Sequence, residues 1–354
     1  MNTKVIRLDT LNYKIEELVP AVEVLKAGGL VAFPTETVYG LGADALDEGA
    51  AAKIYKAKGR PSDNPLIVHI AKVEDMKVLA VDIPDMAYEL AEVFWPGPLT
   101  IILKKNKCVP DKTTGGLDTV AIRLPANKLA KDLISYSGIY IAAPSANISG
   151  KPSPTKAEHV QNDMDGRIDM IIDGGRATLG LESTIVDLSG GKPLILRPGC
   201  ITQNMLQNVI GPIEYDPAII SPELYTELKP KAPGMKYRHY APEGKLTIYE
   251  GSMSKVLNEI NLRAKVKLLE GKSAGIIATD ETKDYYSYGI IKSIGSRKNE
   301  TSIAAELYNI LREFDELHTE YIYSESFLDN DLGQAIMNRL LKAAGYCIIG
   351  LGNE

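Results

Sequence analysis

The sequence predicts an α/β protein with two domains, a larger one built on a mixed twisted sheet with flanking helices and a smaller one with Rossmann-like layering. Three observations lead to this prediction. Short apolar runs typical of buried strands alternate with amphipathic segments of helical period along residues 1–212, and again along 246–354. A proline-punctuated stretch, 213–245, separates the two regions and has no clear period. With 354 residues and 45% hydrophobic content, the chain can bury a large core in each domain.

The elements of the first domain follow from these runs and their stop signals. Glu16 to Ala27 is amphipathic and ends at Gly28-Gly29, a pair that stops helices. Further helices are predicted at 47–57, 84–94, 127–136 and 202–209. Strands are predicted at 30–33, 66–70, 99–104, 119–124, 139–143, 170–172, 183–188 and 194–196. This interleaving predicts a sheet with mixed strand directions, whose polar strand ends are the usual place for a ligand.

The rest of the chain divides into a linker and the smaller domain. Prolines interrupt residues 213–245, and a structureless segment of this length is usually a linker or a functional loop. Beyond it, strands are predicted at 246–249, 274–278, 289–294, 321–323 and 347–351, with helices at 301–314 and 332–344. Thr301 or Ser302 is expected to cap the first of these helices.

Composition argues against several classes of protein. The formal charge of −6 is not that of a chain whose whole surface binds nucleic acid, since the basic residues gather around Lys53 to Arg60 and Lys229 to Arg238. The cysteines, Cys108, Cys200 and Cys347, are far apart and odd in number, which indicates a reducing compartment and no disulfide framework. Neither a signal peptide nor an apolar run of membrane-spanning length is recognisable, so we expect a soluble, cytoplasmic protein without a membrane partner.

The most informative segment is Phe33-Pro34-Thr35-Glu36-Thr37-Val38-Tyr39-Gly40-Leu41-Gly42, which follows a buried strand. It offers three hydrogen-bonding side chains and two glycines that let the backbone approach a ligand. The chain then turns basic through Lys53, Lys58 and Arg60. A polar strand end beside a cationic turn suits a small zwitterion next to a polyphosphate, while the alternative is a Gly-rich turn beside a solvated charge run.

Several common site patterns are absent. No G-x-x-x-x-G-K-[ST] occurs, and the loose G-x-G-x-x-A at 40–45 begins well after the strand, so we interpret it as a tight turn that packs a helix against the sheet. The four histidines have no zinc-binding spacing, and no G-x-S-x-G elbow is present. No metal site held by protein ligands is therefore predicted.

Two strand-end arginines and a small polar turn are candidate ligand contacts. Arg123 and Arg197 each end an apolar run, and a buried arginine normally has an anionic partner, either a structural carboxylate or a ligand. The turn at 145–150, Ser-Ala-Asn-Ile-Ser-Gly, could cradle phosphate or ribose, or be an ordinary Ser/Asn turn. His69, at another strand end, is by itself more typical of a satisfied histidine than of a catalyst.

Taken together, the chain resembles the YrdC-like threonylcarbamoyl-AMP synthase family in its long two-domain form. The resemblance covers essentially the whole chain without a departure at a motif position. Seven segments carry it in order: 33–41, Lys58-Gly59-Arg60-Pro61, Asn64-Pro65-Leu66, 144–150, Glu182-Ser183-Thr184-Ile185-Val186-Asp187, Leu196-Arg197-Pro198-Gly199 and 232–242. It implies a YrdC-like catalytic domain over 1–212, a linker or lid over 213–245 and a Rossmann-like domain over 246–354.

The resemblance also implies the site residues. L-Threonine would be held by Thr35, His69, Arg123 and Ser183, with Arg123 pairing its carboxylate. ATP would be held by Lys58, Ser62, Thr119, Ser145, Asn147, Ser153, Arg197 and Tyr237. The catalytic residues would be Lys58, Arg60 and Arg197. Tyr237 belongs to a segment, 231–242, that also carries Tyr240 and four potential cations, a composition unlike that of a bare tether, so we expect a lid over the ATP site.

The reaction that the resemblance implies needs no side-chain nucleophile. The threonine amine would capture bicarbonate or CO2 as a carbamate, and the carbamate would attack the α-phosphate of ATP to give threonylcarbamoyl-AMP and pyrophosphate. Positioning and neutralisation of charge would suffice, with Mg2+ carried by the ATP phosphates. A downstream tRNA threonylcarbamoyl transferase would consume the product.

Two other functions compete with this one. The first is an RNA-binding or ribosome-associated module without turnover, although the net charge and the lack of aromatic RNA-stacking motifs make stable tRNA binding the weaker hypothesis. The second is an O-carbamoyl transferase, whose members normally carry zinc-finger-like cysteine clusters that three scattered cysteines do not supply.

Overall fold

The computed structural model of the chain describes all residues except 1, 11, 221–231, 233–238, 328–330 and 353–354. The chain forms two compact units. Unit 1 comprises Met1–Ser149, Ser153–Thr178 and Glu182–Tyr237, and unit 2 comprises Gly150–Pro152, Leu179–Leu181 and Arg238–Glu354. The predicted α/β architecture with a larger mixed sheet and a smaller second sheet is confirmed.

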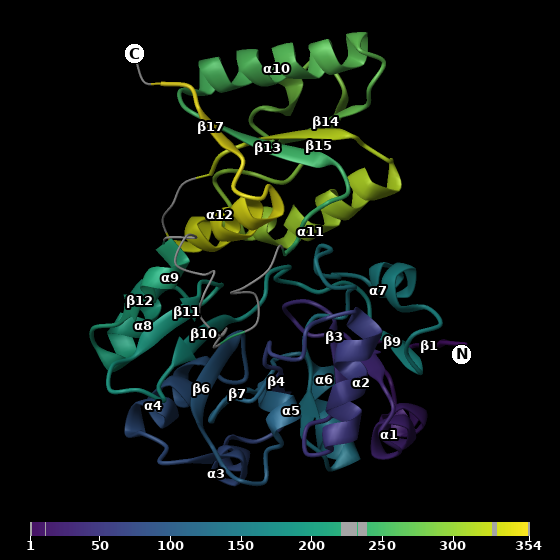
Figure 1. The fold of residues 1–354 in the computed structure, drawn as a ribbon, viewed down its shortest axis with the longest axis vertical. Coiled ribbons are helices and arrows are strands. Elements are labelled where there is room, and N and C mark those ends of the chain that lie inside the picture. The colour runs from purple at the N-terminus through teal and green to yellow at the C-terminus, as the bar shows by residue number, and fades with distance from the viewer. Residues whose placement is uncertain (1, 11, 221–231, 233–238, 328–330, 353–354) are drawn as a thin grey trace. The chain divides into compact units, whose positions relative to one another are not determined.

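Unit 1 is built on a mixed sheet in which twelve strands are described (Figure 1). The strand order is β1-β9-β2-β3-β8-β4-β7-β6-β10-β11-β12, and β5 pairs with β6. The strands are β1 (Lys4–Arg7), β2 (Val31–Phe33), β3 (Gly40–Asp44), β4 (Ile67–His69), β5 (Ala80–Val81), β6 (Leu99–Lys105), β7 (Thr119–Arg123), β8 (Ile141–Ala142), β9 (Met170–Asp173), β10 (Thr184–Asp187), β11 (Leu194–Arg197) and β12 (Glu214–Tyr215).

Helices pack on both faces of this sheet around β2, so that strand is apolar on both sides. The helices are α1 (Val19–Lys26), α2 (Glu48–Lys58), α3 (Met76–Leu79), α4 (Asp85–Phe94), α5 (Asp111–Thr114), α6 (Lys128–Ser137), α7 (Ala157–Met164), α8 (Gln203–Ile210) and α9 (Pro217–Ile220). Along β2, Val31 and Phe33 share a core with α1 and α6. Ala32 instead joins the core beneath α2, α4 and α7. This alternation follows the two-residue period of a strand.

One interpretation of the sequence is wrong at Gly40–Gly42. These residues form no tight turn but the buried strand β3, antiparallel to β2. A Cβ atom on Gly42 would lie 2.7 Å from Ile141 Cγ2 and 2.8 Å from a ring carbon of Phe33. Glycine is therefore needed because neighbouring side chains occupy the space, not because the chain turns.

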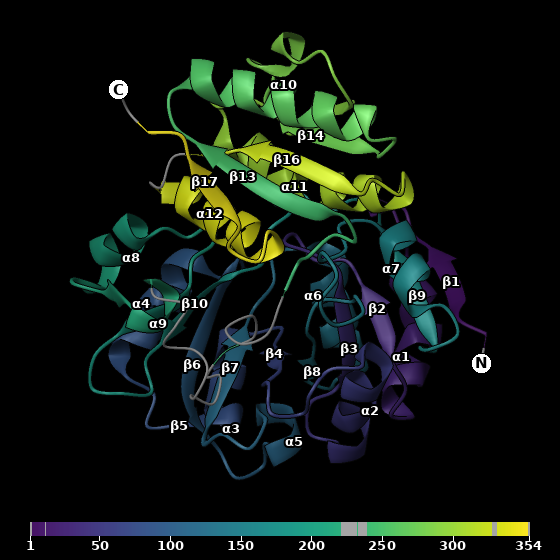
Figure 2. The same cartoon turned by 45° about the horizontal axis from the view of Figure 1, so that its top comes forward.

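Unit 2 is a smaller sheet of five described strands, all parallel, in the order β15-β14-β16-β13-β17. The strands are β13 (Lys245–Glu250), β14 (Ala274–Ala278), β15 (Ile290–Ser293), β16 (Tyr321–Glu325) and β17 (Ile348–Gly350), and the helices are α10 (Met253–Leu269), α11 (Glu300–Glu316) and α12 (Asp331–Ala343). Figure 2 shows α10 on one face of this sheet and α11 on the other. The predicted Rossmann-like layering is present, but α10 was missed from the sequence.

Other departures are local. The helix expected over Glu16 to Ala27 begins as a 3₁₀ turn, Ile15–Leu18, before α1. Strand β1 and helix α7 were not predicted, and the stretch 213–245, expected to lack structure, contains β12 and α9. Within the described residues, no helix is both long and apolar enough to cross a membrane.

Candidate active site

The turn between β2 and β3 is organised by the side chain of Thr35. Its hydroxyl donates to the carbonyl of Val38 at 2.6 Å and accepts the backbone N–H groups of Thr37 and Val38, both at 3.2 Å. The hydroxyls of Thr35 and Thr37 lie 2.8 Å apart. Since the Thr35 proton goes to Val38, Thr37 is the donor of this pair. The side chains of Thr35, Thr37 and Val38 are all buried, so the polar atoms of this turn are held in fixed positions.

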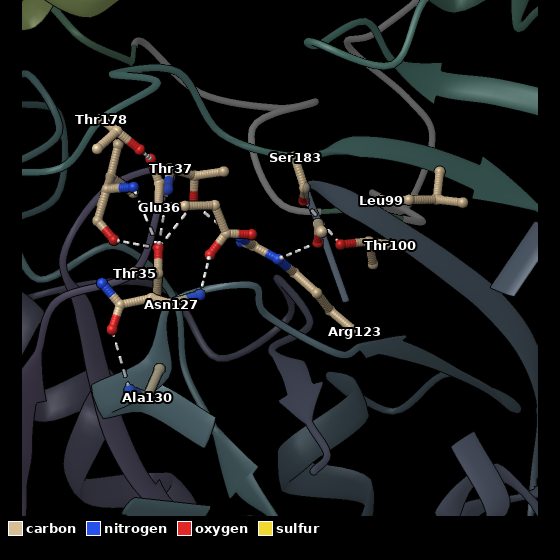
Figure 3. Close-up of polar contacts among 12 residues, drawn as sticks. Thr35, Glu36, Thr37, Leu99, Thr100, Arg123, Asn127, Ala130, Thr178 and Ser183 are labelled. Atoms are coloured by element: carbon tan, nitrogen blue, oxygen red, sulfur yellow. Dashed lines mark hydrogen bonds and ion pairs between the residues drawn. The ribbon is translucent and has the colours of Figure 1, made fainter. Parts of the chain in front are cut away.

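A buried ion pair joins this turn to the end of β7. Arg123 Nη2 lies 2.6 Å from Glu36 Oε1, with the two side chains 5% and 10% exposed. Arg123 Nη1 donates to the Thr37 hydroxyl at 2.9 Å, and Asn127 N donates to Glu36 Oε2 at 3.3 Å (Figure 3). The sequence left the partner of Arg123 open, and the structure supplies a carboxylate from the chain itself.

This pairing sets the charge state of Glu36. Burial by itself would raise the pKa of the Glu36 carboxyl, but the charge and hydrogen bond of Arg123 outweigh it and hold that pKa below its usual range. The pair is therefore fully ionised near neutral pH. Glu36 was not among the predicted site residues. Its signal was its place in the polar segment after β2, next to Thr35.

His69 lies beside Arg123, since the two residues pair across β4 and β7. Its Nδ1 is 3.1 Å from the carbonyl oxygen of Ile67, which can only accept, so the ring proton lies on Nδ1. Burial and the positive charge of Arg123 lower the pKa of His69 to about 3. The imidazole is neutral at physiological pH and adds no positive charge beside Arg123.

Ser183 and Arg197 are held together at the neighbouring strand ends. Arg197 Nε donates to the Ser183 carbonyl at 3.0 Å, and Nη2 to its hydroxyl at 3.1 Å. The Ser183 hydroxyl is also 2.7 Å from that of Thr100. Both Ser183 and Arg197 are buried. Thr100 was not predicted, and nothing in its apolar strand marked it.

These residues line one edge of the sheet. His69, Arg123, Thr100, Ser183 and Arg197 lie in, or next to, β4, β7, β6, β10 and β11, which are consecutive in the sheet. The strands β4 and β7 are parallel, as are β6 and β10, whereas β6 is antiparallel to β7 and β11 is antiparallel to β10. The ends of β4, β7 and β11 therefore lie at the same edge as the starts of β6 and β10. The order of strands thus gathers residues that are far apart in sequence.

A second group surrounds Lys58, the last residue of α2. Its buried ammonium donates to the carbonyls of Ser145 at 2.5 Å and Asn147 at 2.6 Å. The Ser145 hydroxyl donates to Asn147 Oδ1 at 2.5 Å. Lys58 therefore fixes the small polar turn that follows β8. Arg60 Nη2 donates to the carbonyls of Asn64 and Pro65 at 3.2 and 3.1 Å, which closes the loop before β4.

The remaining predicted residues are more scattered. Ser153 is buried and donates to Glu182 Oε1 at 2.6 Å, so it contacts the segment that leads into Ser183. Ser62 is exposed in the loop after α2, and Thr119 is half-buried at the start of β7, the opposite end of that strand from Arg123. Tyr237 lies outside the described residues.

The donor set does not form a metal cage. No group of three or more His, Cys, Asp or Glu side chains that could hold a metal ion occurs in the part of the chain that the structure describes. Glu36 and Glu182 are already engaged by Arg123 and Ser153. Hydroxyl, amide and carbonyl oxygens dominate the site, which suits an ion that arrives bound to a ligand's phosphates.

Comparisons with known proteins cover both units. A family described as "Telomere recombination" (Sua5, YciO and YrdC) matches residues 23–199, and one described as "Threonylcarbamoyl-AMP synthase, C-terminal domain" matches 201–345. Threonylcarbamoyl-AMP synthase of Pyrococcus abyssi is 50% identical over 93% of this chain and 94% of its own. The Bacillus subtilis protein of that name is 48% identical over 96% of each. The crystal structure of P. abyssi Sua5 complexed with L-threonine superposes with a TM-score of 0.92 and 45% identity, covering 99% of this chain and all of that one.

Proposed function

The chain belongs to the threonylcarbamoyl-AMP synthase family, and we propose that it makes L-threonylcarbamoyladenylate and pyrophosphate from L-threonine, ATP and bicarbonate or CO2. It is accordingly an enzyme of the nucleotidyltransferase type. The observation that carries the proposal is the row of buried polar residues in, or next to, five consecutive strands, among them Arg123 with its ion pair to Glu36. A relative of the same two-unit length binds L-threonine.

In this proposal the first group of residues holds threonine. Arg123 faces the threonine carboxylate, and its bond to Glu36 fixes the plane of the guanidinium. The neutral ring of His69 accepts a hydrogen bond from the threonine amine or hydroxyl and adds no positive charge beside Arg123. The hydroxyls of Thr35 and Ser183, which are already ordered, complete the contacts.

The second group acts on ATP. Lys58 holds the turn of Ser145 and Asn147, so that their polar groups are positioned before the nucleotide arrives. Arg60 and Arg197 add positive charge for the triphosphate. Mg2+, brought by ATP, would neutralise phosphate charge when bound, and water and hydroxyl oxygens suit its remaining positions.

The chain's own part in the chemistry is to bind and orient. The threonine nitrogen forms a bond to the inorganic carbon, and in this step bicarbonate loses a C–O bond as water, or, with CO2, the amine gives a proton to solvent. A carbamate oxygen then forms a bond to the α-phosphorus while the bond from that phosphorus to the bridging oxygen of the β-phosphate breaks. Pyrophosphate leaves with that electron pair. The carbamate is the nucleophile, so the absence of a Ser-His-Asp arrangement among the described residues is compatible with turnover. We further propose that a separate transferase uses the product to modify tRNA.

The segment predicted as a lid has one informative described residue. Ala232 is fully buried and packs with Ile67, Ile102, Ala121, Ile185 and Leu196, which lie on the five strands that carry the site residues. Ala232 itself therefore lies against the strands that carry the site residues, which supports the proposed lid. We expect Ala232→Asp, which puts a charge against these apolar side chains, to depress synthesis or release free AMP, and circular dichroism checks that unit 1 is still folded. Ala27→Asp, at an exposed position, is the control, and undiminished synthesis by Ala232→Asp would reject the lid.

The proposed function is tested by an activity assay from which each substrate is omitted in turn. The full chain is incubated with ATP and Mg2+, with and without L-threonine and with and without bicarbonate. Pyrophosphate release and the acyl-adenylate, detected by mass spectrometry, should appear only when both are present. Equal pyrophosphate release with either omitted would overturn the assigned reaction. Saturable, salt-sensitive RNA binding without turnover would instead favour an RNA-binding module.

A further inference from the structure

Unit 1 has a hollow of about 500 Å³ that is lined by none of the residues of the candidate active site. It lies between the edge strand β1, the start of α7 and the loop that follows β9, three segments that Figures 1 and 2 both show side by side. Its polar lining comes mainly from Arg7, Lys156, Glu158, Asp173 and Arg176. We refer to it as the β1–α7 hollow. Its volume is in the range of small-molecule sites.

The charges that line this hollow favour an anion. Three cations face two carboxylates there, although the whole chain has a net charge of −6. Asp173 is already engaged, since its Oδ2 is 3.2 Å from Arg7 Nε and its Oδ1 accepts Gly175 N at 3.1 Å. It therefore anchors Arg7 at the rim of the hollow and offsets part of its charge. Local concentration of cations in a concave surface raises the concentration of anions there.

Lys156 is the cation whose charge is least compensated. It precedes the first residue of α7 in an extended conformation, and its side chain is only partly exposed. Within the described ranges it forms neither an ion pair nor a side-chain hydrogen bond, in contrast to Arg7. Ala157 and Glu158, the first residues of α7, also line the hollow. The positive end of the helix dipole adds to the attraction for an anion.

The frame of the hollow is rigid. The hydroxyl of buried Tyr39 donates to the carbonyl of Gly175 at 2.5 Å and accepts Gly174 N at 3.3 Å. Ala177 N donates to the carbonyl of Thr155 at 2.9 Å, which ties the loop after β9 to the residue before Lys156. The cationic side chains therefore project from segments fixed to each other, which lowers the entropic cost of binding. Tyr39 belongs to the same polar segment as Thr35.

We propose that the β1–α7 hollow binds a small phosphate anion of about the size of a diphosphate. The volume exceeds that of a single phosphate, and the cations that line the hollow come from three segments, β1, the residue before α7 and the loop after β9. An RNA backbone is less well matched, because Glu158 and Asp173 interrupt the positive surface and none of the described residues that line the hollow is aromatic. The two possible sources of a phosphate group, a soluble diphosphate and an RNA, are separated by experiment.

The test measures binding of inorganic pyrophosphate to the full chain by calorimetry. L-Threonine and a non-hydrolysable ATP analogue are kept saturating, so that the candidate active site is occupied. We expect one remaining saturable site for pyrophosphate, and its affinity should fall at least tenfold in the double variant Lys156→Gln, Arg176→Gln. The control variant Lys131→Gln, Lys192→Gln removes the same charge elsewhere, and its affinity for pyrophosphate should stay within twofold of that of the wild type. Glu158→Gln, which removes a negative charge from the hollow, should tighten binding.

Other outcomes overturn the proposal. It fails if no saturable pyrophosphate binding remains when the active site is occupied, or if the hollow variant and its charge-matched control are affected equally. It also fails if the hollow variant loses affinity for tRNA while binding pyrophosphate like the control. Circular dichroism and turnover with ATP and L-threonine establish that the variants are folded, since none of these side chains belongs to the candidate active site.

Discussion

Replacing Glu36 by glutamine should destabilise unit 1 while keeping its shape. The substitution retains an oxygen that can accept from Arg123 but removes the charge that compensates the guanidinium, of which only 5% is exposed. Breaking one partner of a buried pair typically costs about 3–5 kcal/mol, and we take the lower bound because the hydrogen bond survives. For a domain of this size, about 3 kcal/mol corresponds to a fall in melting temperature of roughly 6–12 °C.

The same variant should alter the response to acid. The pKa of Glu36 is below its ordinary value of 4.5 in the folded protein, because Arg123 outweighs the effect of burial. A carboxyl whose pKa is lowered by folding contributes stability that is fully present above its unfolded pKa and disappears as the pH falls through the folded one. Glu36→Gln lacks this contribution. The difference in the free energy of unfolding between wild type and variant should therefore be largest near neutral pH and should become smaller below about pH 4.

The assay is thermal unfolding of the full chain, followed by circular dichroism from pH 7 to pH 3. Asp82→Asn is the matched control, since it breaks the exposed pair with Lys104 and should cost less than about 1 kcal/mol. A double-mutant cycle with Arg123→Gln should show coupling of at least about 2 kcal/mol. If Glu36→Gln unfolds like the control, or if its deficit is the same at pH 7 and pH 3, the pair does not stabilise the site as argued.

Three further outcomes are expected. Arg123→Lys keeps the charge beside Glu36 but loses the planar fork, so L-threonine should bind more weakly by about 2 kcal/mol while ATP affinity hardly changes; equal losses for both ligands, measured by calorimetry, would point to a structural role alone. His69, whose pKa is lowered to about 3, should show no imidazole titration by NMR between pH 5 and pH 8, and an inflection near pH 6.5 would contradict its neutral state in the buried site. Gly42→Ala should lower stability by about 1–3 kcal/mol through overpacking against Ile141 and Phe33, whereas Gly190→Ala, where an added Cβ atom meets nothing within 4 Å, should have little effect.

The sequence predicts correctly those elements whose apolar pattern fits only one type of secondary structure. The strands β4, β6, β7, β10 and β11 are short apolar runs, and their burial on both faces is what makes the runs continuous. Helix α10 shows the opposite case. It buries Val256, Ile260 and Ala264 on one side, while Leu262 and Leu269 are exposed. With apolar residues around the helix, no single stripe stands out, and the helical period is lost.

Glycine misled the sequence analysis for a physical reason. Gly40 and Gly42 lower the strand propensity of β3 and resemble the glycines of a phosphate-binding turn. Their function in the fold is to leave room for Ile141 and Phe33, which come from other strands. Ile141 is 99 positions from Gly42, and the pairing of β2 with β3 brings Phe33 against it, so the segment alone does not reveal why glycine is needed.

The partners of the site residues could not be predicted from the sequence for the same reason. Arg123 was identified as a residue that needs an anion, because a charge at the end of an apolar strand is costly unless it is paired. Its partner, Glu36, is 87 positions away. Likewise Ser183 meets Thr100, 83 positions away, because β10 pairs with β6. Local chemistry thus selects the residues that require partners, whereas the order of strands decides which partners they obtain. Where strand order is not the order of the sequence, as in β4-β7-β6-β10-β11, only the folded sheet can turn a set of candidates into a site.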